Sequence, residues 1–435
     1  MHRNTNRISR RGLLRSAAAA AAGAAAAPYV LTSTALGAEG KPPASDRIVM
    51  GGIGIRSRGG SDLNWMMGEK DVQFVAICDV RRDQREKVKQ LADRKYGNND
   101  CKMYRDLREF LPSRPDIDGV LIATGERWHA MAATLAMKHG KDVYCEKPGS
   151  MTVAEGQGLV RAAKRYGRVF QTGTQRRSEA NFIFAEQLAR TGRLGKLHTL
   201  RAHIAPWNPI LRHDWLPAET EPDRDVIDWD IWLGACPWRP FNMSYVNGGW
   251  RGFYDFHTGD VGEWGSHTIC QCQGVMTEGM YPTEFIHPGN DDGEGLVAVY
   301  PNGVKLILNR KGWRGSCGAT FEGDRGWAAA ADGYSITDVS DPALLADFKT
   351  VVRDYVAETR RPLNHMRDLL DCIKTRRQPV ANPVVSHRSM SIVHCANICL
   401  WLGRDLKWDP AREEFFNDDE ANRLRSRAMR QPWHV

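Results

Sequence analysis

Lys147, Glu263 and His267 have the residue types and the spacing that proton and hydride transfer require. Lys147 follows an apolar run of strand length at 142–145, and an ammonium group at a strand end can lower the pKa of an alcohol beside it. Glu263 and His267 are four residues apart, so on a helix they share one face and can hydrogen-bond. A carboxylate beside an imidazole fixes its tautomer and raises its basicity, which suits a base that removes an alcohol proton. The three residues therefore predict a site at which an alcohol is oxidised while a hydride leaves its carbon.

A hydride acceptor needs a binding site, and a glycine turn near the N-terminus predicts one. The apolar run 47–53 enters a turn in which Gly52 and Gly54 take the first two places of G-x-G-x-x-G and Ser57 takes the third. Glycine allows a tight turn and a close approach of the backbone to a pyrophosphate at a helix N-terminus. The turn therefore predicts a dinucleotide site.

Asp79 indicates which dinucleotide that site prefers. It ends the next apolar run, 72–78, where a carboxylate can accept hydrogen bonds from both ribose hydroxyls of adenosine. The same charge repels a 2′-phosphate, so Asp79 favours NAD. Arg81 and Arg82 leave NADP open as the alternative, because either could bind that phosphate.

Segments of strand length and of helix length alternate in the first half of the chain and predict a parallel sheet. The expected strands are 47–53, 72–78, 118–123, 142–145 and 168–172, and the expected helices are 82–96, 129–139 and 152–166. Later strand candidates are 196–203, 296–299 and 304–308, and later helices are 364–375 and 388–402. We expect an α/β Rossmann domain at 46–172 with a doubly wound parallel sheet. An α+β domain at 173–435 follows, with a mainly antiparallel sheet, C-terminal helices and a tail.

The composition is that of an ordinary globular protein. Of the 435 residues 42% are apolar and 26% are charged, which excludes a disordered chain and a small disulfide scaffold. The net charge is +8, but five arginines stand in the first 38 residues, where there is no acid. The rest of the chain carries only about +3, so we expect no nucleic-acid partner.

The first 38 residues have the features of a twin-arginine export signal. Arg10 and Arg11 precede an alanine run at 17–27 and small residues near Ala38, as in such signals. We expect 1–38 to be the signal, 39–45 to be a Pro/Gly linker and the mature protein to be periplasmic. No later apolar stretch reaches 18 residues, so we expect no membrane span in the mature chain.

A set of motifs makes the chain resemble the Gfo/Idh/MocA family, which is named for glucose–fructose oxidoreductase and inositol dehydrogenase. A strand that ends in Glu146-Lys147-Pro148 after two βα units is among the most specific. The others are at 123–129, 171–177, 248–255, 263–267 and 406–410, so the resemblance covers essentially the whole chain after the leader. It implies a Rossmann domain followed by a domain with a large open sheet that mediates homo-oligomer formation.

The resemblance also implies roles for individual residues. Lys147 points at the substrate hydroxyl beside the nicotinamide, Pro148 follows a cis peptide bond, and His267 is the catalytic acid/base. Glu263 stands where the family usually has Asp, so its contacts can shift, and Cys270 replaces an Asp of many relatives, which argues against an inositol-like specificity. The candidate cofactor-binding residues are Gly52, Ile53, Gly54, Ser57, Arg58, Asp79, Thr124, Trp128, His129, Glu146 and Lys147, and the candidate substrate-binding residues are Arg176, Arg177, Trp250 and Arg251.

Two other features each have two explanations. Asp255, His257, Asp260, Glu263 and His267 fall within 13 residues, but without a His-Glu-x-x-His or Cys/His spacing, so we expect no metal. Seven of the 14 tryptophans lie within 207–264, where either stacking on sugars or packing in a core or subunit interface explains them.

Export would restrict the chemistry, because no pool of NAD(H) is replenished outside the cytoplasm. An enzyme that stays loaded for hours must release its cofactor at about 10⁻⁴ s⁻¹ or slower, which corresponds to roughly nanomolar affinity. Our leading hypothesis is an NAD(P)-dependent oxidoreductase that acts on a hydroxyl of a sugar, polyol or glycoside and recycles a tightly bound cofactor internally. The alternatives are a glycoside hydrolase that works by transient oxidation and elimination, and a non-catalytic exported sugar-binding protein.

Overall fold

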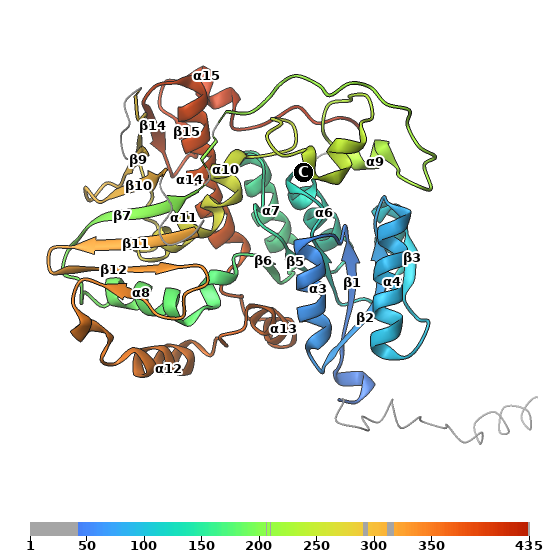
Figure 1. Cartoon of the computed structure of the whole chain (residues 1–435), viewed down its shortest axis with the longest axis horizontal. Helices are drawn as coiled ribbons and strands as arrows, with labels where there is room; N and C mark the ends of the chain where they lie inside the picture. The colour runs from blue at the N-terminus through green and yellow to red at the C-terminus, as the bar shows by residue number, and fades with distance from the viewer. Residues whose placement is uncertain (1–41, 206, 209, 290–294, 311–316, 434–435) are drawn as a thin grey trace, which may run out of the picture. The chain divides into compact units, whose positions relative to one another are not determined.

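The computed structural model describes residues 42–433 except 206, 209, 290–294 and 311–316. The predicted export signal at 1–38 and the first part of the linker lie outside these residues. Ala44–Asp46 form a short 3-10 helix, η1. The described residues from Ile48 onward form one compact unit, which contains two β-sheets (Figure 1).

The first sheet is parallel throughout and confirms the predicted Rossmann domain. In the described part of the chain its strands are β1 (Ile48–Ile53), β2 (Val72–Cys78), β3 (Lys102–Tyr104), β4 (Gly119–Ile122), β5 (Asp142–Cys145) and β6 (Phe170–Thr172). Their order is β3-β2-β1-β4-β5-β6, and neighbouring strands are parallel. Ile53 pairs with Cys78 and with Ile122, so β1, β2 and β4 end at the same edge. The glycine turn and Asp79 follow β1 and β2 at that edge.

Helices cover both faces of this sheet. They are α3 (Arg58–Gly68), α4 (Arg82–Tyr96), α5 (Leu107–Ser113), α6 (Glu126–Lys138) and α7 (Val153–Tyr166). The side chain of Thr152 accepts a hydrogen bond from the N–H of Glu155, so the predicted start of α7 is confirmed. By contrast, α6 begins three residues before the predicted helix at 129–139, which places Glu126 in its first turn.

One helix of the C-terminal half also packs on the Rossmann sheet. In α13 (His365–Thr375), Met366, Leu369 and Leu370 are buried in one cluster with Met50 and Phe74. The predicted domain boundary at residue 173 therefore lies between the two sheets, but α13, which follows it in the sequence, packs with the Rossmann domain.

The second sheet is mixed and mostly antiparallel, as predicted. The described strands are β7 (Leu197–Ile204), β8 (Glu284–Ile286), β9 (Gly295–Val299), β10 (Lys305–Asn309), β11 (Cys317–Gly323), β12 (Gly326–Ala331), β13 (Asp338–Val339), β14 (Leu406–Asp409) and β15 (Glu414–Phe415). They follow the order β13-β12-β11-β7-β10-β9-β8-β14-β15. β7 and β10 are parallel, and the other paired neighbours are antiparallel.

Helices of the C-terminal half form the core of the second domain with this sheet. They include α8 (Ala180–Arg190), α10 (Gly259–Glu263), α11 (Gly265–Gly274), α12 (Phe348–Thr359), α14 (Pro383–Leu402) and α15 (Asp419–Arg423). α14 starts five residues before the predicted helix at 388–402, because Asn382 caps it through hydrogen bonds from the N–H groups of Val384 and Val385. None of the described helices is long and apolar enough to cross a membrane.

A segment at 212–256, the cover segment, extends from the second domain over the edge of the Rossmann sheet (yellow-green, carrying α9, in Figure 1). It contains α9 (Trp229–Leu233) and η3 (Tyr245–Gly249). The main chain of Asp228 donates a hydrogen bond to Val80, and the main chain of Arg82 donates one to Val226. Trp229 and Trp232 stack at 4.6 Å and are buried, so packing explains this part of the tryptophan cluster.

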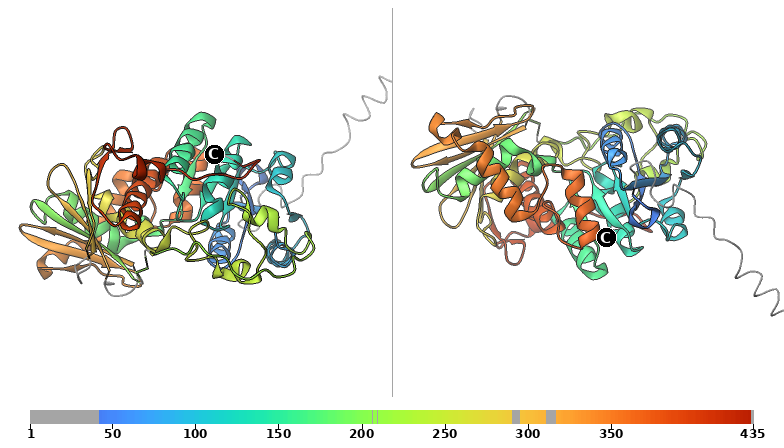
Figure 2. Two further views of the ribbon diagram at one scale, coloured as in Figure 1. Left: turned by 90° about the horizontal axis from the view of Figure 1, so that it is seen from above. Right: turned by 90° about the horizontal axis from the view of Figure 1, so that it is seen from below.

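The C-terminal tail returns to the Rossmann domain after α15, as Figure 2 shows from above and below. Arg427 Nε pairs with Glu155 at 2.6 Å. The ring of Trp433 meets that of Trp128 edge to face at 4.8 Å. Tail and cover segment together fix the position of α6.

Candidate active site

One cavity of about 500 Å³ connects the glycine turn with α11. It is lined from the ends of several Rossmann strands, from the cover segment and from α10 and α11. Most predicted cofactor-site residues line it, namely Ile53, Gly54, Ser57, Arg58, Asp79, Thr124, Trp128, His129, Glu146 and Lys147. Gly52 does not, because it faces Phe74, which a Cβ would approach to 2.9 Å. Glu263 and His267 line the same cavity.

Gly54 and Gly59 make the close approaches that a dinucleotide turn requires. Gly54 has a φ of +66°, and a Cβ there would lie 2.4 Å from Thr124 Cγ2. A Cβ on Gly59 would lie 2.5 Å from that of Ala123, so Gly59 lets α3 pack closely on the end of β4. Ser57, predicted at the third glycine position, lines the cavity and has a positive φ of 44°, but the close contact between helix and strand is made two residues later, at Gly59. This cradle, which a Cβ would fill, fits a dinucleotide pyrophosphate.

Asp79 is 8% exposed and accepts a hydrogen bond from the N–H of Arg81 at 2.9 Å. Burial raises the pKa of Asp79 to about 6, so the carboxylate is ionised at neutral pH. Arg81 lines the cavity but is paired with Asp83 at 2.6 Å. Arg82 is paired with Asp225 and does not line the cavity. Both arginines are thus engaged elsewhere, and the site favours NAD.

Lys147 lies directly after β5, and its peptide bond to Pro148 is cis, as predicted. Its Nζ donates a hydrogen bond to the main-chain carbonyl of Glu263 at 2.7 Å. The same nitrogen lies 5.4 Å from the ring centre of Trp264. These contacts hold the ammonium group at the wall of the cavity.

Glu146 belongs to a buried polar network behind Lys147. It accepts a hydrogen bond from Gln175 Nε2 at 2.7 Å. Arg58 pairs with Asp62 at 2.8 Å and approaches Glu146 to 3.8 Å. Burial, reinforced by the charge of Glu146, raises the pKa of Asp62 to about 8. The network therefore retains a proton at neutral pH and fixes Arg58 at the start of α3, beside the glycine turn.

His267 lies in the first turn of α11 and is 3% exposed. Its Nε2 lies 3.5 Å from Nη1 of Arg176, and because a guanidinium can only donate, Nε2 is the acceptor. Its Nδ1 has no hydrogen-bond partner among the described residues. Burial and the charges of Arg176 and Lys147 lower the pKa of His267 well below its usual value. The ring is therefore neutral and can accept a proton.

The predicted hydrogen bond between Glu263 and His267 is absent. α10 ends at Glu263 and α11 begins at Gly265, so the two residues do not lie on one continuous helix. The Glu263 carboxylate accepts hydrogen bonds from Arg251 Nε and from His257 instead, each at 3.0 Å. Burial opposes its ionisation, but the bond from His257 and the charges of Lys147 and Arg251 outweigh burial and lower the pKa of Glu263 to about 2.

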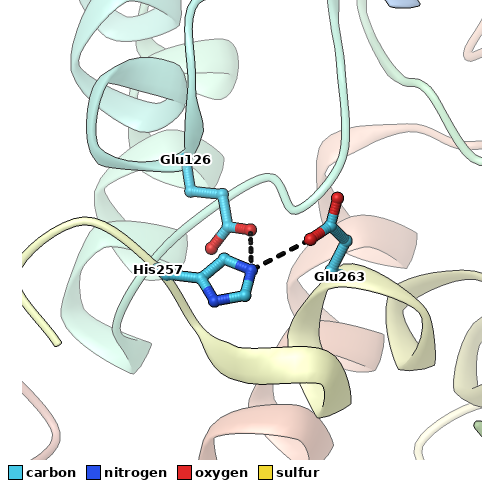
Figure 3. A group of neighbouring side chains, drawn as sticks. All are labelled: Glu126, His257 and Glu263. Carbon is cyan, nitrogen blue, oxygen red and sulfur yellow. Dashed lines mark hydrogen bonds and ion pairs between the residues drawn. The ribbon is translucent and has the colours of Figure 1, made fainter. Parts of the chain in front are cut away.

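Glu126, His257 and Glu263 form a cluster whose nitrogen and oxygen atoms lie within 4.8 Å of one another (Figure 3). His257 Nε2 is 3.0 Å from Glu263 and 3.4 Å from Glu126. Glu126 also accepts hydrogen bonds from the N–H and the hydroxyl of Thr258, at 2.6 and 2.7 Å. Burial raises the pKa of Glu126. The cluster thus connects α6 of the Rossmann domain to the second domain.

Glu126, His257 and Glu263 could hold a metal ion by their residue types. The hydrogen bond made by Nδ1 of His257 indicates instead that a proton occupies Nε2, between the carboxylates. That Nδ1 accepts the N–H of Gly252 at 3.1 Å, so in a neutral ring Nε2 carries the proton. That proton lies between the two carboxylates. A metal at Nε2 would require the proton on Nδ1, where it would face the N–H of Gly252. The predicted absence of a metal therefore stays a prediction that this tautomer supports.

The four candidate substrate residues do not all reach the cavity. Arg176, Trp250 and Arg251 line it; Arg176 is also paired with Asp332, and the Arg251 guanidinium lies 4.5 Å from the Trp250 ring centre. Arg177 does not line it and donates to the carbonyl of Cys270 at 3.2 Å. The prediction that Arg177 contributes to this site is not supported by its position.

Sequence reasoning missed several residues of the site. Gly59 carries a signal, since it is the next glycine in the helix start after Ser57. Gln175 stands inside the motif at 171–177 and could have been found there. Glu126 stands inside the motif at 123–129 and Arg56 inside the glycine turn, but their partners, Thr258 and Val246, are more than a hundred residues away and could not be found from the sequence.

Comparison with known families assigns the chain to one of them. Residues 47–174 match the oxidoreductase family with an NAD-binding Rossmann fold, and residues 212–435 match the C-terminal alpha/beta domain of that family. The chain therefore belongs to the Gfo/Idh/MocA oxidoreductase family, and its N-terminal domain is the NAD-binding domain.

Individual relatives cover only part of the chain. Myo-inositol 2-dehydrogenase of Thermotoga maritima is 31% identical over 131 residues, which are 30% of this chain and 37% of that protein. A glycosyl hydrolase family 109 protein of Shewanella baltica is 34% identical over 176 residues, which are 36% of this chain and 37% of that protein. The chain thus spans little more than a third of the length of these relatives.

Solved structures show the same two-domain fold. The WlbA dehydrogenase from Chromobacterium violaceum, in complex with NADH and UDP-GlcNAcA, has a TM-score of 0.59 and 15% identity, covering 85% of this chain and 98% of that one. The aldose-aldose oxidoreductase from Caulobacter crescentus has a TM-score of 0.54 and 17% identity, covering 83% of this chain and 99% of that one.

Proposed function

We propose that this protein is an NAD-dependent oxidoreductase that acts on a hydroxyl group of a sugar, a polyol or a glycoside. One observation carries the proposal: Lys147 and His267 line the same cavity as Gly54 and Asp79. The proton-transfer groups and the dinucleotide cradle are thus parts of one site. NAD bound there supplies the hydride acceptor.

The side chains at the α11 end of the cavity divide the proton transfer among them. Lys147 donates a hydrogen bond to the substrate oxygen and stabilises the negative charge that develops on it. His267, kept neutral by burial and by Arg176, accepts the hydroxyl proton, which requires the long contact between Arg176 and its Nε2 to yield to the substrate. Glu263 is a positioning residue, because its carbonyl holds Lys147 while Arg251 and His257 hold its carboxylate.

We also propose that the cofactor is retained between turnovers. The cover segment supports this, since Ile231, Trp232, Val246 and Asn247 line the cavity and Arg127 donates a hydrogen bond to the carbonyl of Trp232 at 2.8 Å. We infer that these contacts slow the release of NAD. A retained cofactor suits a protein exported in its folded state through the twin-arginine route.

A glycoside hydrolase of redox-neutral mechanism is the second candidate, and the similarity to the glycosyl hydrolase family 109 protein favours it. In that reaction a transient ketone acidifies the neighbouring C–H bond, the leaving group is eliminated, water adds and the ketone is reduced again. Lys147 and His267 serve the same proton transfers. The product is free sugar, without net formation of NADH.

The first experiment is to purify the protein expressed with its leader, denature it and identify any nucleotide released. Near-stoichiometric NAD(H) supports the retained cofactor. A protein that is empty and fails to take up added NAD overturns the oxidoreductase proposal and leaves the sugar-binding alternative. Glycosides are then assayed for free sugar and NADH together, which separates net oxidation from hydrolysis.

We further propose that the protein is periplasmic and that it forms a homo-oligomer through the second sheet. Cell fractionation tests the location, and light scattering of the purified protein tests the assembly. A cytoplasmic monomer would contradict both.

A further inference from the structure

A separate cavity of about 200 Å³ lies among η2 (Gln175–Ser178), α8, α11 and α14. It shares no lining residue with the cofactor cavity. Three arginines line it, Arg177, Arg190 and Arg388, together with residues such as Cys270 and Gln273. Three cations around so small a space require an explanation.

Several N–H donors of Arg177 and Arg388 in this cavity have no hydrogen-bond partner among the described residues. Nε of Arg177 and both Nε and Nη2 of Arg388 are buried, and none has a hydrogen-bond partner in the part of the chain that the structure describes. Arg388 does lie over the ring of Tyr281, 4.7 Å from its centre. A ring face compensates only part of a buried charge, and buried donors on charged groups are costly when left unpaired.

Acidic groups near the cavity do not balance the arginines. Glu186 is the buried acid there, 3.9 Å from Arg177 and 3.5 Å from Arg190. Glu278 also lines the cavity but is exposed. The exposed Arg190 is further satisfied by the carbonyl of Gly274 at 2.9 Å. Arg177 therefore shares Glu186 with Arg190, and Arg388 has no ion pair in the part of the chain that the structure describes, so the three arginines together leave a net positive charge around the cavity.

The neutral polar side chains around the cavity are already engaged. The hydroxyl of Ser389 donates to the carbonyl of Val385, and Nε2 of Gln273 donates to the carbonyl of Met280. The free donors are thus all on guanidinium groups, whose planar fork matches the oxygens of an oxyanion. The cavity selects for negative charge and not for hydroxyl groups.

We propose that this cavity binds one small oxyanion, either a phosphate or the carboxylate of an organic acid, between Arg177 and Arg388. Such an ion would also be connected to the active site through the contacts of Arg177. Arg177 donates to Cys270 of α11, less than one turn after His267, and Arg177 adjoins Arg176, whose guanidinium contacts Nε2 of His267. The bound ion would therefore join η2 to α14, and Arg177 connects that link to α11 through its hydrogen bond to Cys270.

Calorimetric titration of the full chain with inorganic phosphate tests the proposal. The buffer keeps ionic strength constant with chloride and contains saturating NAD, because the glycine turn could itself bind phosphate. We expect saturable binding of one ion per chain and at least tenfold weaker binding by Arg388→Met. The matched control is Arg353→Met, since that side chain is 72% exposed and paired with Asp354. A parallel titration with acetate and succinate distinguishes a carboxylate from a phosphate site.

The thermal midpoint gives a second readout. Phosphate raises the midpoint of most proteins by exclusion from their surface, so the proposal requires an additional rise in the wild type that Arg388→Met lacks. If Arg388→Met does not fold, Arg388→Lys keeps the charge but removes the fork, and it must bind phosphate more weakly. Absence of binding heat with all three anions overturns the proposal, as does equal binding by the wild type and the Arg388 variant.

Discussion

The ammonium group of Lys147 donates its hydrogen bond to the main-chain carbonyl of Glu263, 2.7 Å away. The Glu263 carboxylate is thereby left to Arg251 and His257, and His267 faces Arg176 instead. The side chains of Glu263 and His267 therefore differ in charge. Glu263 is held ionised, with a pKa of about 2, while burial keeps His267 neutral. We therefore propose His267, and not the acid beside it, as the proton acceptor of the site.

Removing either proton-transfer group should abolish turnover without preventing NAD binding. His267→Ala removes a positioned base, for which we expect a fall in kcat of about 10²–10⁴-fold. Lys147→Met removes the cation that stabilises the developing charge, for which we expect about 10²–10³-fold. Steady-state kinetics and NAD titration measure the two effects separately. Turnover near the wild-type level in both variants would refute the assigned roles.

Three glycines of one turn and helix allow a test of the cofactor cradle. Gly54→Ala would bring a Cβ to 2.4 Å from Thr124 at a φ of +66°, and Gly59→Ala would bring one to 2.5 Å from Ala123. Overpacking of this kind is expected to destabilise by about 1–3 kcal/mol, and displacement of the turn should weaken NAD binding. Denaturant unfolding and NAD titration measure both.

Gly60 supplies the matched control for these variants. A Cβ there has open space around it, and Gly60 lies inside α3. Gly60→Ala should leave NAD binding unchanged and stabilise the protein by about 0.5–1 kcal/mol through helix propensity. If all three alanine variants bind NAD equally, the turn does not hold the cofactor.

The Rossmann half was predictable from the sequence because its signals are local. The strand at 72–78 is apolar except for Gln73, and Thr152 with Glu155 marks a helix start within four residues. The close packing of Gly59 on Ala123 was not predicted, because Gly59 lies two residues beyond the third position of the motif. β12 was missed because the alanines from 328 to 331 are all buried, so they show no alternation between polar and apolar residues.

The part of the site that escaped prediction depends on contacts between distant segments. Glu126 bonds Thr258 across 132 residues, and nothing near Glu126 in the sequence indicates that partner. The expected pair of Glu263 and His267 assumed a continuous helix, which the break at Trp264 interrupts. The tryptophans had two explanations, and only the fold shows that Trp229 packs in a core while Trp250 and Trp264 line the cavity. Trp232 does both, because it stacks on Trp229 and also lines the cavity.

NAD affinity should depend on the ionisation of Asp79. Burial raises the pKa of this carboxyl from its ordinary value to about 6, and ribose hydroxyls donate to the ionised form. Protonation as the pH falls below about 6 therefore opposes binding, so the Kd for NAD should rise by up to about tenfold for each further pH unit. Asp79→Asn should bind more weakly at pH 7 and show no such dependence. A variant whose pH profile matches the wild type would assign the titration to another group.

The cluster of Glu126, His257 and Glu263 should prove to hold a proton and not a metal ion. Because Nδ1 of His257 accepts the N–H of Gly252, we expect purified protein to contain far less than one metal per chain by elemental analysis. Dialysis against a chelator should leave kcat unchanged. Glu126→Gln keeps the shape but removes a charge that accepts two hydrogen bonds from Thr258, so it should lower stability by about 1–3 kcal/mol and change kcat only a few-fold. Glu420→Gln is the control, since that side chain is 67% exposed, and it should alter neither quantity. Stoichiometric metal that both chelation and Glu126→Gln remove, together with activity, would show that the cluster is a metal centre after all.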